Sequence, residues 1–233
     1  MLKYDLVVIG GGPAGLNAAY QLAIKGYAVT VMDMMPEMGG MLRYGIPEYR
    51  LPKAVLDQEI ALIADMGVEM KPNFKIGVDA SFEEIRAAHD ATVVAIGAWT
   101  SMSARCPGEE LEGVWGGIHL LREIALGNRP NIGEKVVVMG GGNTAMDACR
   151  SAVRLGAKEV SIVYRRTLDE MPAEKIEIAE AGEEGVKFHF LAAPVKLEKK
   201  ELYQGKKETG VTFHKVDNKL NVGNSICCLS FIT

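Results

Sequence analysis

The chain has 233 residues, of which 48% are hydrophobic and 24% are charged, and its formal net charge is −4. This length allows one large domain or two of about 100–150 residues each, and the composition is that of an ordinary globular protein. The acidic balance argues against a nucleic-acid partner, because a phosphate-binding surface carries an excess of Lys and Arg. The apolar stretches are short and interrupted by glycine, so none of them predicts a membrane span.

The first 33 residues predict a buried strand, a glycine-rich turn, a helix and a second strand. Residues 5–9 (DLVVI) form a continuous apolar run, as in a strand that is covered on both faces of a parallel sheet. The turn at residues 10–15 (GGGPAG) leads into an Ala-rich helix capped by Gly26, and the next apolar strand ends on Asp33. Because the chain runs straight into a strand, we expect no secretory signal.

The stretch between residues 39 and 131 begins with a loop and ends with a linker. The loop has the sequence GGMLRYGIPEYRLP and covers residues 39–52. We expect the following elements after it: a helix at 53–66, strands near 68–70 and 74–76, a helix led by Ser81 with a capping box to Glu84, a strand at 91–96 and a connecting helix at 116–126. Residues 128–131 (NRPN) predict a linker, so we divide the chain into domains at 1–128 and 129–233.

Residues 135–166 repeat the pattern of the first unit. The strand KVVVM is followed by GGGNTA at residues 140–145, a helix, a capping Gly156 and another apolar strand. The glycines at 10, 11, 12 and 26 correspond to those at 140, 141, 142 and 156 with one constant offset. A single glycine-rich match is weak evidence, but two complete strand–turn–helix–strand matches in phase predict an α/β fold with two Rossmann-like units.

The rest of the chain is less regular. We expect a helix around 174–181, a strand at 186–191 and a hairpin with strands near 195–197 and 211–213. The charged run between the hairpin strands mixes Lys with Glu, which favours a solvated loop over a basic binding patch. Residues 217–233 show neither helical nor strand periodicity, and the sequence leaves them unassigned.

In the first unit, the turn has the residues that a dinucleotide-binding site needs. Gly10 permits a tight turn, Gly12 lets the backbone approach a pyrophosphate, and Gly15 allows close packing of helix and strand. Pro13 suits the first helical turn, and the helix N-terminus directs unpaired N–H groups toward the phosphates. Asp33 can accept hydrogen bonds from ribose hydroxyls.

In the second unit, the residues after the second strand point to a particular nicotinamide dinucleotide. Ala145 takes the third glycine position, which the motif allows, and the strand ends on Tyr164, Arg165 and Arg166 in place of an acid. Two guanidiniums can bind a 2′-phosphate through forked, charge-assisted hydrogen bonds, which favours NADPH over NADH. The alternative is that both arginines are surface charges or pair with the nearby acids, Asp169 and Glu170.

The sequence predicts no catalytic side chain and no metal site. The four cysteines form no C-x-x-C pair, and the histidines are scattered. Unpaired thiols suggest a reducing, cytoplasmic setting. Hydride transfer between a nicotinamide and a flavin is done by the cofactors while the protein supplies position and electrostatics, so two nucleotide sites without catalytic side chains suit that chemistry.

The segments GGGPAG, GGMLRYGIPEYRLP, GGGNTAMDACR and VYRRTLDEMPAE closely resemble the NADPH-dependent flavoprotein family of the glutamate synthase small subunit, over about residues 1–215. The flavin and NADPH region of dihydropyrimidine dehydrogenase and the flavin subunits of ferredoxin-linked transhydrogenases are related to it. The resemblance implies an FAD site made by Gly10, Gly12, Pro13, Ala14, Gly15, Asp33, Gly40, Met41 and Arg50. It implies an NADPH site made by Gly141, Gly142, Asn143, Thr144, Arg165 and Arg166.

The chain departs from the family pattern at both ends. The family's cysteine-rich iron–sulfur domain is absent, and nothing after Asp217 matches the returning half of the FAD domain. We therefore expect an FAD domain without its C-terminal half and a nicotinamide domain without its final strand.

Three functions remain in view. The first is an FAD oxidoreductase that passes electrons from NADPH to FAD and on to an iron–sulfur protein or a glutamate synthase large subunit, or a ferredoxin-linked relative of it. The second is a non-catalytic fragment that binds a nucleotide without stable FAD. The third is a thioredoxin-reductase-like enzyme, which the lack of a C-x-x-C motif opposes.

Overall fold

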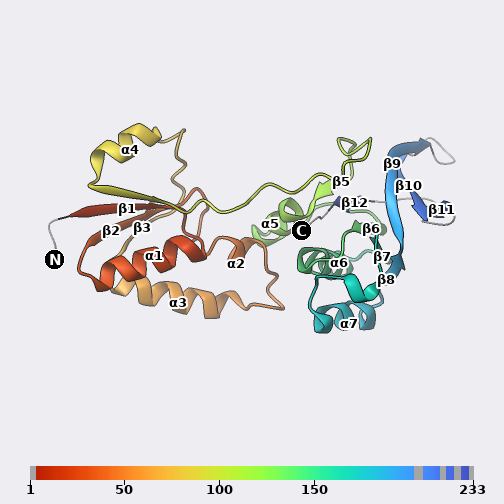
Figure 1. The fold of residues 1–233 in the computed structure, drawn as a ribbon, viewed down its shortest axis with the longest axis horizontal. Helices are drawn as coiled ribbons and strands as arrows, with labels where there is room; N and C mark the ends of the chain where they lie inside the picture. The colour runs from red at the N-terminus through yellow and green to blue at the C-terminus, as the bar shows by residue number, and fades with distance from the viewer. Residues whose placement is uncertain (1–3, 202–206, 216–218, 223–226, 231–233) are drawn as a thin grey trace. The chain divides into compact units, whose positions relative to one another are not determined.

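The computed structural model describes residues 4–201, 207–215, 219–222 and 227–230, with side chains up to residue 198 (Figure 1). The chain divides into two compact units, Met1–Ala98 and Trp99–Thr233. Each unit contains its own parallel β-sheet with helices packed on it. In the described part of the chain, no helix is both long and apolar enough to cross a membrane.

The first unit is a four-stranded parallel sheet with the strand order β3-β2-β1-β4. Its strands are β1 (Asp5–Ile9), β2 (Ala28–Met32), β3 (Glu69–Lys71) and β4 (Ala91–Val94), and its helices are α1 (Pro13–Ile24), α2 (Met41–Tyr44), α3 (Lys53–Asp65) and α4 (Phe82–Ala88). Helices α1 and α3 cover one face of the sheet and α4 covers the other (Figure 1).

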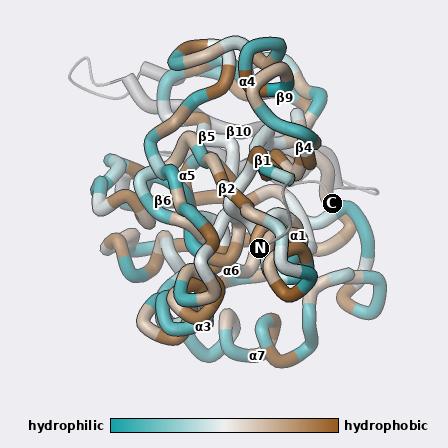
Figure 2. Tube along the Cα trace, turned by 90° about the vertical axis from the view of Figure 1, so that its left-hand side faces the viewer, coloured by the Kyte–Doolittle hydropathy of each residue, from teal (hydrophilic) through white to brown (hydrophobic). Residues whose placement is uncertain are grey.

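Strand β1 is buried on both faces, as its continuous apolar sequence predicts. Val8 packs with Leu16 and Ala19 of α1, whereas Val7 and Ile9 belong to a second cluster with Ile85 of α4. Neighbouring side chains of a strand point to opposite faces, so alternate residues of the run pack into two separate cores. Helix α3 shows hydrophobic and hydrophilic residues in turn, as expected for a helix with one buried side (Figure 2).

One expected strand of the first unit is absent from the sheet. The sequence predicted a strand at residues 74–76, but this segment contains only an isolated bridge between Ile76 and Ala80. Asn73 and Gly77 on either side have φ angles of 56° and 84°, which interrupt an extended run. The segment instead turns back, and the amide of Phe74 donates to the carbonyl of Asp33 at 2.8 Å.

The second unit contains a five-stranded parallel sheet with the order β5-β12-β6-β7-β8. Its elements are β5 (Val114–Gly116), α5 (Gly117–Ala125), β6 (Lys135–Met139), α6 (Asn143–Leu155), β7 (Glu159–Tyr164), the 3-10 helix η1 (Leu168–Glu170), α7 (Lys175–Glu183), β8 (Lys187–Phe190) and β12 (Cys227–Ser230). The expected hairpin is confirmed as part of an antiparallel sheet formed by β9 (Ala192–Glu201), β10 (Lys207–Lys215) and β11 (Lys219–Val222).

The expectation of a missing final strand in this sheet was wrong. Strand β12 runs parallel between β5 and β6, with Cys227 opposite Val136 and Ser230 opposite Met139. A short apolar run in the middle of a parallel sheet has no alternation that a sequence pattern could reveal, which is why the tail had no assignment. Residues 216–218, 223–226 and 231–233 of that tail lie outside the described residues.

The compact units divide between Ala98 and Trp99, whereas the division expected from sequence assigned residues 99–128 to the first domain. Helix α5 explains the difference, because its Leu120 is fully buried in the same core cluster as Val138 and Met146. The division by cofactor, with residues 1–128 for FAD and 129–233 for NADPH, stays a prediction.

Candidate nucleotide-binding sites

The first glycine-rich turn connects β1 to α1 at the carboxyl edge of the sheet. Gly10 has a φ of +111°, and a Cβ there would lie 2.3 Å from the carbonyl oxygen of Ala95. A side chain is therefore excluded by both backbone conformation and space. Helix α1 follows with Gly12 as its N-cap and Pro13 at its first position. Its first turn leaves backbone N–H groups without helical partners, which is the arrangement that binds phosphate.

Gly15 lies where the helix packs on the turn that precedes it. A Cβ at this position would meet the Gly10 carbonyl oxygen at 1.8 Å, which is far inside a van der Waals contact. The role expected for Gly15, close approach of helix and strand, matches this geometry. Ala14 lies between these glycines in the first turn of α1 and is exposed.

Asp33 connects the end of β2 to the turn. Its buried carboxylate accepts hydrogen bonds from the amide of Gly11 at 2.6 Å and from the amide of Met35 at 2.8 Å. A carboxylate offers about four lone-pair positions, so these two bonds leave capacity for ribose hydroxyls. The sequence predicted only the contact with ribose. The tie to Gly11 is an additional, structural role of the same carboxylate.

The loop at residues 39–52 lies directly against the first turn. The amide of Gly39 donates to the carbonyl of Gly11 at 2.7 Å, and a Cβ on Gly40 would lie 2.6 Å from the Cα of Gly12. Gly40 also has a φ of +53°, so only glycine fits this approach. Met41 begins α2 immediately afterwards. Arg50 lies farther along the loop, in a turn where its amide donates to the carbonyl of Pro47 at 3.1 Å.

Two cations that the sequence reasoning missed fix this loop. The Lys53 ammonium donates to the carbonyls of Leu42, Ile46 and Leu51 at 3.1, 2.7 and 2.9 Å. The buried Arg43 guanidinium donates to the Met38 carbonyl at 2.6 Å and forms ion pairs with Glu37 and Asp57. Arg43 within the Gly- and Pro-rich loop, and Lys53 directly after it, were the sequence signal for this role.

The second turn has the same strand–turn–helix geometry as the first, but it packs against a different side chain. Gly140 has a φ of +143°, Gly142 is the N-cap of α6, and Ala145 in the third position is fully buried. A Cβ on Gly141 would lie 2.7 Å from the ring of Tyr164. The turn therefore packs against the aromatic side chain at the end of β7.

A cavity of about 390 Å³ opens at this turn. Its lining includes Gly140, Gly141, Gly142, Tyr164, Arg165 and Arg166. Both arginine side chains are exposed to solvent, and neither forms an ion pair with any residue whose side chain is described. Four of the six residues predicted for NADPH thus line one cavity. Asn143 and Thr144 begin α6 beside it and are not among its lining residues.

The segment Thr167–Glu174 forms another wall of this cavity through Glu170 and Pro172. The amide and hydroxyl of Thr167 donate to the Glu170 carboxylate at 3.1 and 3.0 Å, and these bonds hold the pKa of Glu170 below its usual range. The Tyr164 hydroxyl donates to the Glu170 carbonyl at 2.9 Å. The suggested pairing of Arg165 and Arg166 with nearby acids is therefore not seen among the described side chains.

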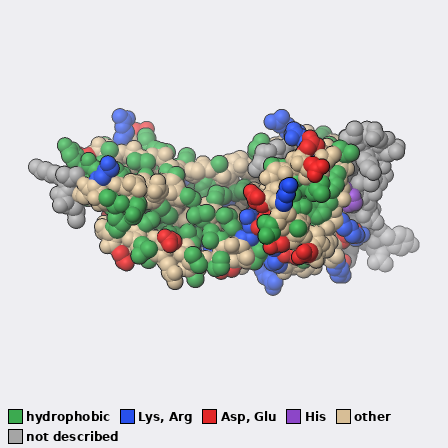
Figure 3. Space-filling model, turned by 60° about the horizontal axis from the view of Figure 1, so that its bottom comes forward, with side chains coloured by type: hydrophobic (Ala, Val, Ile, Leu, Met, Phe, Trp, Pro, Cys, Tyr) green, Lys and Arg blue, Asp and Glu red, His purple; other side chains and the backbone are tan. Residues whose placement is uncertain are grey.

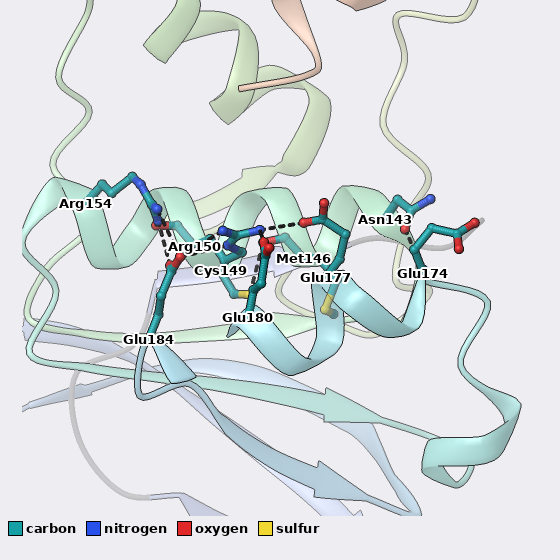
Figure 4. A network of polar contacts seen from close by, with 9 residues as sticks. All are labelled: Asn143, Met146, Cys149, Arg150, Arg154, Glu174, Glu177, Glu180 and Glu184. Atoms are coloured by element: carbon teal, nitrogen blue, oxygen red, sulfur yellow. Dashed lines mark hydrogen bonds and ion pairs between the residues drawn. The ribbon is translucent and has the colours of Figure 1, made fainter. Parts of the chain in front are cut away.

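The far end of the segment is tied to the phosphate-binding turn. The amide of Ala173 donates to the carbonyl of Gly141 at 3.1 Å, and the amide of Glu174 donates to Oδ1 of Asn143 at 2.9 Å (Figure 4). The Asn143 side-chain oxygen thus binds the protein itself. Asn143 therefore positions this segment. The sequence predicted Asn143 only as a residue that binds the cofactor.

A charge cluster fixes α7, which follows this segment, against α6 (Figure 4). Buried Arg150 of α6 forms ion pairs with three glutamates of α7 and its end, Glu177 at 2.5 Å, Glu180 at 2.6 Å and Glu184 at 2.9 Å. Arg154 also pairs with Glu184, at 2.6 Å. Hydrogen bonds from Arg154 and Arg150 lower the pKa of Glu184 to about 2. The sequence reasoning did not find this cluster, because its members lie on separate helices.

The cysteines and the possible metal ligands among the described residues bear on thiol and metal chemistry. Cys149 is fully buried, and burial raises its pKa to about 12, so its thiolate is not accessible at neutral pH. Where side chains are described, no group of three or more His, Cys, Asp and Glu residues could hold a metal ion. The face shown in Figure 3 carries acidic and basic side chains intermixed over the second unit, without a basic patch.

Residues 4–222 match the family described as pyridine nucleotide-disulphide oxidoreductase. The chain is 46% identical over 196 residues to NADP(+)-dependent formate dehydrogenase subunit beta of Moorella thermoacetica, which covers 82% of this chain and 28% of that protein. It is 43% identical over 205 residues to the small chain of NADPH glutamate synthase of Azospirillum brasilense, with 83% and 42% covered. Among solved structures, Mycobacterium tuberculosis FprA in complex with NADPH has a TM-score of 0.78 at 18% identity, covering 98% of this chain and 70% of that one.

The chain therefore belongs to the pyridine nucleotide-disulphide oxidoreductase family. This membership confirms the expected fold class, the resemblance to the glutamate synthase small chain and the cofactor pair of FAD and NADPH for the family. The likeness to FprA shows the fold. The chain spans less than half the length of the Moorella and Azospirillum relatives.

Proposed function

We propose that this chain is the nucleotide-binding part of an oxidoreductase that takes electrons from NADPH into FAD. The observation that carries the proposal is the cavity of about 390 Å³ that is lined both by Arg165 and Arg166 and by the turn before α6. A helix N-terminus and two guanidiniums on one cavity are complementary to a dinucleotide that carries both a pyrophosphate and a 2′-phosphate. When both cofactors are bound, the nicotinamide supplies a hydride and the flavin accepts it.

The first unit fits the adenosine diphosphate half of FAD. Gly12, Pro13, Ala14 and Gly15 would hold the pyrophosphate at the start of α1, where the free backbone N–H groups of the first helical turn lie. The remaining lone pairs of the Asp33 carboxylate would accept hydrogen bonds from the ribose hydroxyls. Gly40, Met41 and Arg50 would close the site from the adjoining loop, which Lys53 and Arg43 keep in shape.

The second unit fits NADPH. Gly141, Gly142, Asn143 and Thr144 would place backbone N–H groups against the pyrophosphate, and Arg165 and Arg166 would bind the 2′-phosphate. NADH lacks that phosphate, so the two arginines would give it no advantage. The site would therefore select NADPH by a charge contact that NADH cannot make.

A partner would receive the electrons. Both relatives are named as a subunit or chain of a larger enzyme. We propose that electrons leave FAD for an iron–sulfur protein or a large subunit of the glutamate synthase type. A reducing, cytoplasmic setting remains our prediction, and the buried free thiols of Cys106 and Cys149 are compatible with it.

A second candidate is a chain that binds the nucleotide without retaining FAD. This chain covers only 28% and 42% of the two relatives, and this partial coverage is the observation that supports the second candidate. The visible spectrum of the purified protein separates the two. Flavin absorption near one FAD per chain supports the oxidoreductase, and a colourless protein that still binds NADPH supports the second candidate.

The NADPH assignment is tested by titration calorimetry with NADPH and NADH. Wild type should bind NADPH more tightly, and Arg165→Ala and Arg166→Ala should each weaken NADPH binding by about 10-fold, the effect of losing one charged hydrogen-bonding partner. NADH binding should hardly change. Arg129→Ala is the matched control, because Arg129 is exposed and is not among the lining residues. Equal binding of the two nucleotides by wild type would refute the assignment.

A further inference from the structure

A carboxylate lines the same cavity as the arginine pair. Glu170, Arg165 and Arg166 all contribute to its wall. In the site of a doubly charged phosphate, such a carboxylate is unfavourable in two ways. It attracts the guanidiniums that the phosphate needs, and it repels the phosphate itself.

The structure shows what occupies this carboxylate. Its Oε2 accepts hydrogen bonds from the amide and the hydroxyl of Thr167, at 3.1 and 3.0 Å, in a capping box around η1. These bonds favour the charged form, so Glu170 is ionised at neutral pH. The Arg166 charge also lowers the pKa of Glu170, but at a distance, since Glu170 forms no ion pair with Arg165 or Arg166 among the described side chains.

The backbone around Glu170 is fixed at both ends. Tyr164 donates to the Glu170 carbonyl at 2.9 Å, and three residues later Ala173 is bonded to Gly141 at 3.1 Å. Met171 between them is buried in the core of the second unit. Because the backbone is fixed in this way, the direction of the Glu170 carboxylate depends on its side-chain rotamer, and Thr167 supplies the bonds that select it.

We propose that Thr167 is a specificity-determining positioning residue, which holds the Glu170 carboxylate so that Arg165 and Arg166 stay available to a 2′-phosphate. This inference rests on the proposed NADPH site. It adds a residue that follows Arg166 directly in the chain, is not among the lining residues of the cavity, and would act through Glu170. The chemical class that it selects is an adenine dinucleotide with a 2′-phosphate.

Thr167→Val keeps the shape of the side chain and removes its hydroxyl, so that one of the two bonds to the Glu170 carboxylate is lost and only the backbone amide still holds it away from the arginines. We expect NADPH affinity to fall by about two- to fivefold, the worth of one exposed ion pair, with NADH affinity unchanged. Thr167→Ser retains the hydroxyl and should behave as wild type. Asp169→Asn is the matched control, since Asp169 is exposed and is not among the lining residues.

The double variant Thr167→Val with Glu170→Gln decides whether the effect passes through Glu170. With the charge removed, NADPH affinity in titration calorimetry should return to the wild-type value or exceed it. A loss that persists in the double variant, or a loss shared by NADH, would overturn the inference. Unchanged NADPH affinity in Thr167→Val would do the same while leaving the arginine site intact. Wild type without preference for NADPH would instead refute the proposed function and this inference with it.

Discussion

The helix α1 approaches the preceding turn so closely that a Cβ on Gly15 would lie 1.8 Å from the carbonyl oxygen of Gly10. Gly15→Ala must therefore push the helix away from the strand, and overpacking of this kind costs about 1–3 kcal/mol. Urea unfolding should show this loss, with lower FAD retention. Gly182→Ala in α7 is the control, because the nearest atom to a Cβ there is 4.0 Å away. Removing glycine from an unstrained helix should stabilise the protein by about 0.5–1 kcal/mol. Equal effects of the two variants would contradict the packing argument.

Lys53 fixes the loop that lies against the first turn. Lys53→Met keeps the length of the side chain and removes three donors to backbone carbonyls, which leaves the carbonyls of Leu42, Ile46 and Leu51 without this partner. We expect a several-fold increase in the Kd for FAD, measured by quenching of flavin fluorescence, with NADPH binding unchanged. Lys75→Met, at an exposed position, should change neither. FAD binding that is unaffected by Lys53→Met would show that the loop does not need this anchor.

The cluster between α6 and α7 makes stability depend on acid pH. Glu184 has a pKa lowered to about 2 by Arg154 and Arg150, whereas an unfolded glutamate titrates near 4.3. Its contribution to stability is therefore complete above about pH 4.3 and is lost as the pH falls toward the folded value. Glu184→Gln should lower the urea midpoint at pH 7, and its difference from wild type should shrink between about pH 5 and 2.

Glu183→Gln is the control for this pH dependence, since Glu183 is the exposed neighbour of Glu184 and belongs to no ion pair among the described residues. If both variants followed the same pH profile as wild type, the ion pairs of Glu184 would contribute nothing measurable.

Cys149 should be unreactive in the folded protein. Its thiol is fully buried, and its pKa is raised to about 12. Alkylation at neutral pH, followed site by site with peptide mass spectrometry, should leave Cys149 unmodified until urea unfolds the second unit. Reduction of flavin by NADPH should also be unchanged in Cys149→Ala. Rapid alkylation of Cys149 in the native protein would contradict this prediction and would support a function that uses the thiol.

The glycine-rich turns could be predicted from the sequence because they depend on local chemistry. A buried strand, a glycine that takes a positive φ and a helix start follow one another within a few residues, and both turns are found where they were expected. Asp33 and the arginine pair follow the second strand of each unit, so their positions come from the same local pattern.

The remaining features depend on contacts between segments that are distant in sequence. Arg150 meets Glu177, Glu180 and Glu184 only because α6 and α7 pack side by side, and no spacing in the sequence encodes that pairing. Strand β12 also depends on distant segments, because its four residues form a strand by pairing with β5 and β6 on either side. Lys53 is a helical residue by pattern, and its role appears only when the loop folds back over it.

We propose that the two glycine-rich turns serve one electron transfer, from NADPH to FAD. The most direct test is to load the purified protein with FAD, remove oxygen and follow the visible flavin absorbance after adding NADPH or NADH. We expect rapid bleaching with NADPH, much slower bleaching with NADH, and loss of the NADPH advantage in the double variant Arg165→Ala with Arg166→Ala. A protein that binds FAD and NADPH, yet leaves the flavin oxidised, would contradict this proposal.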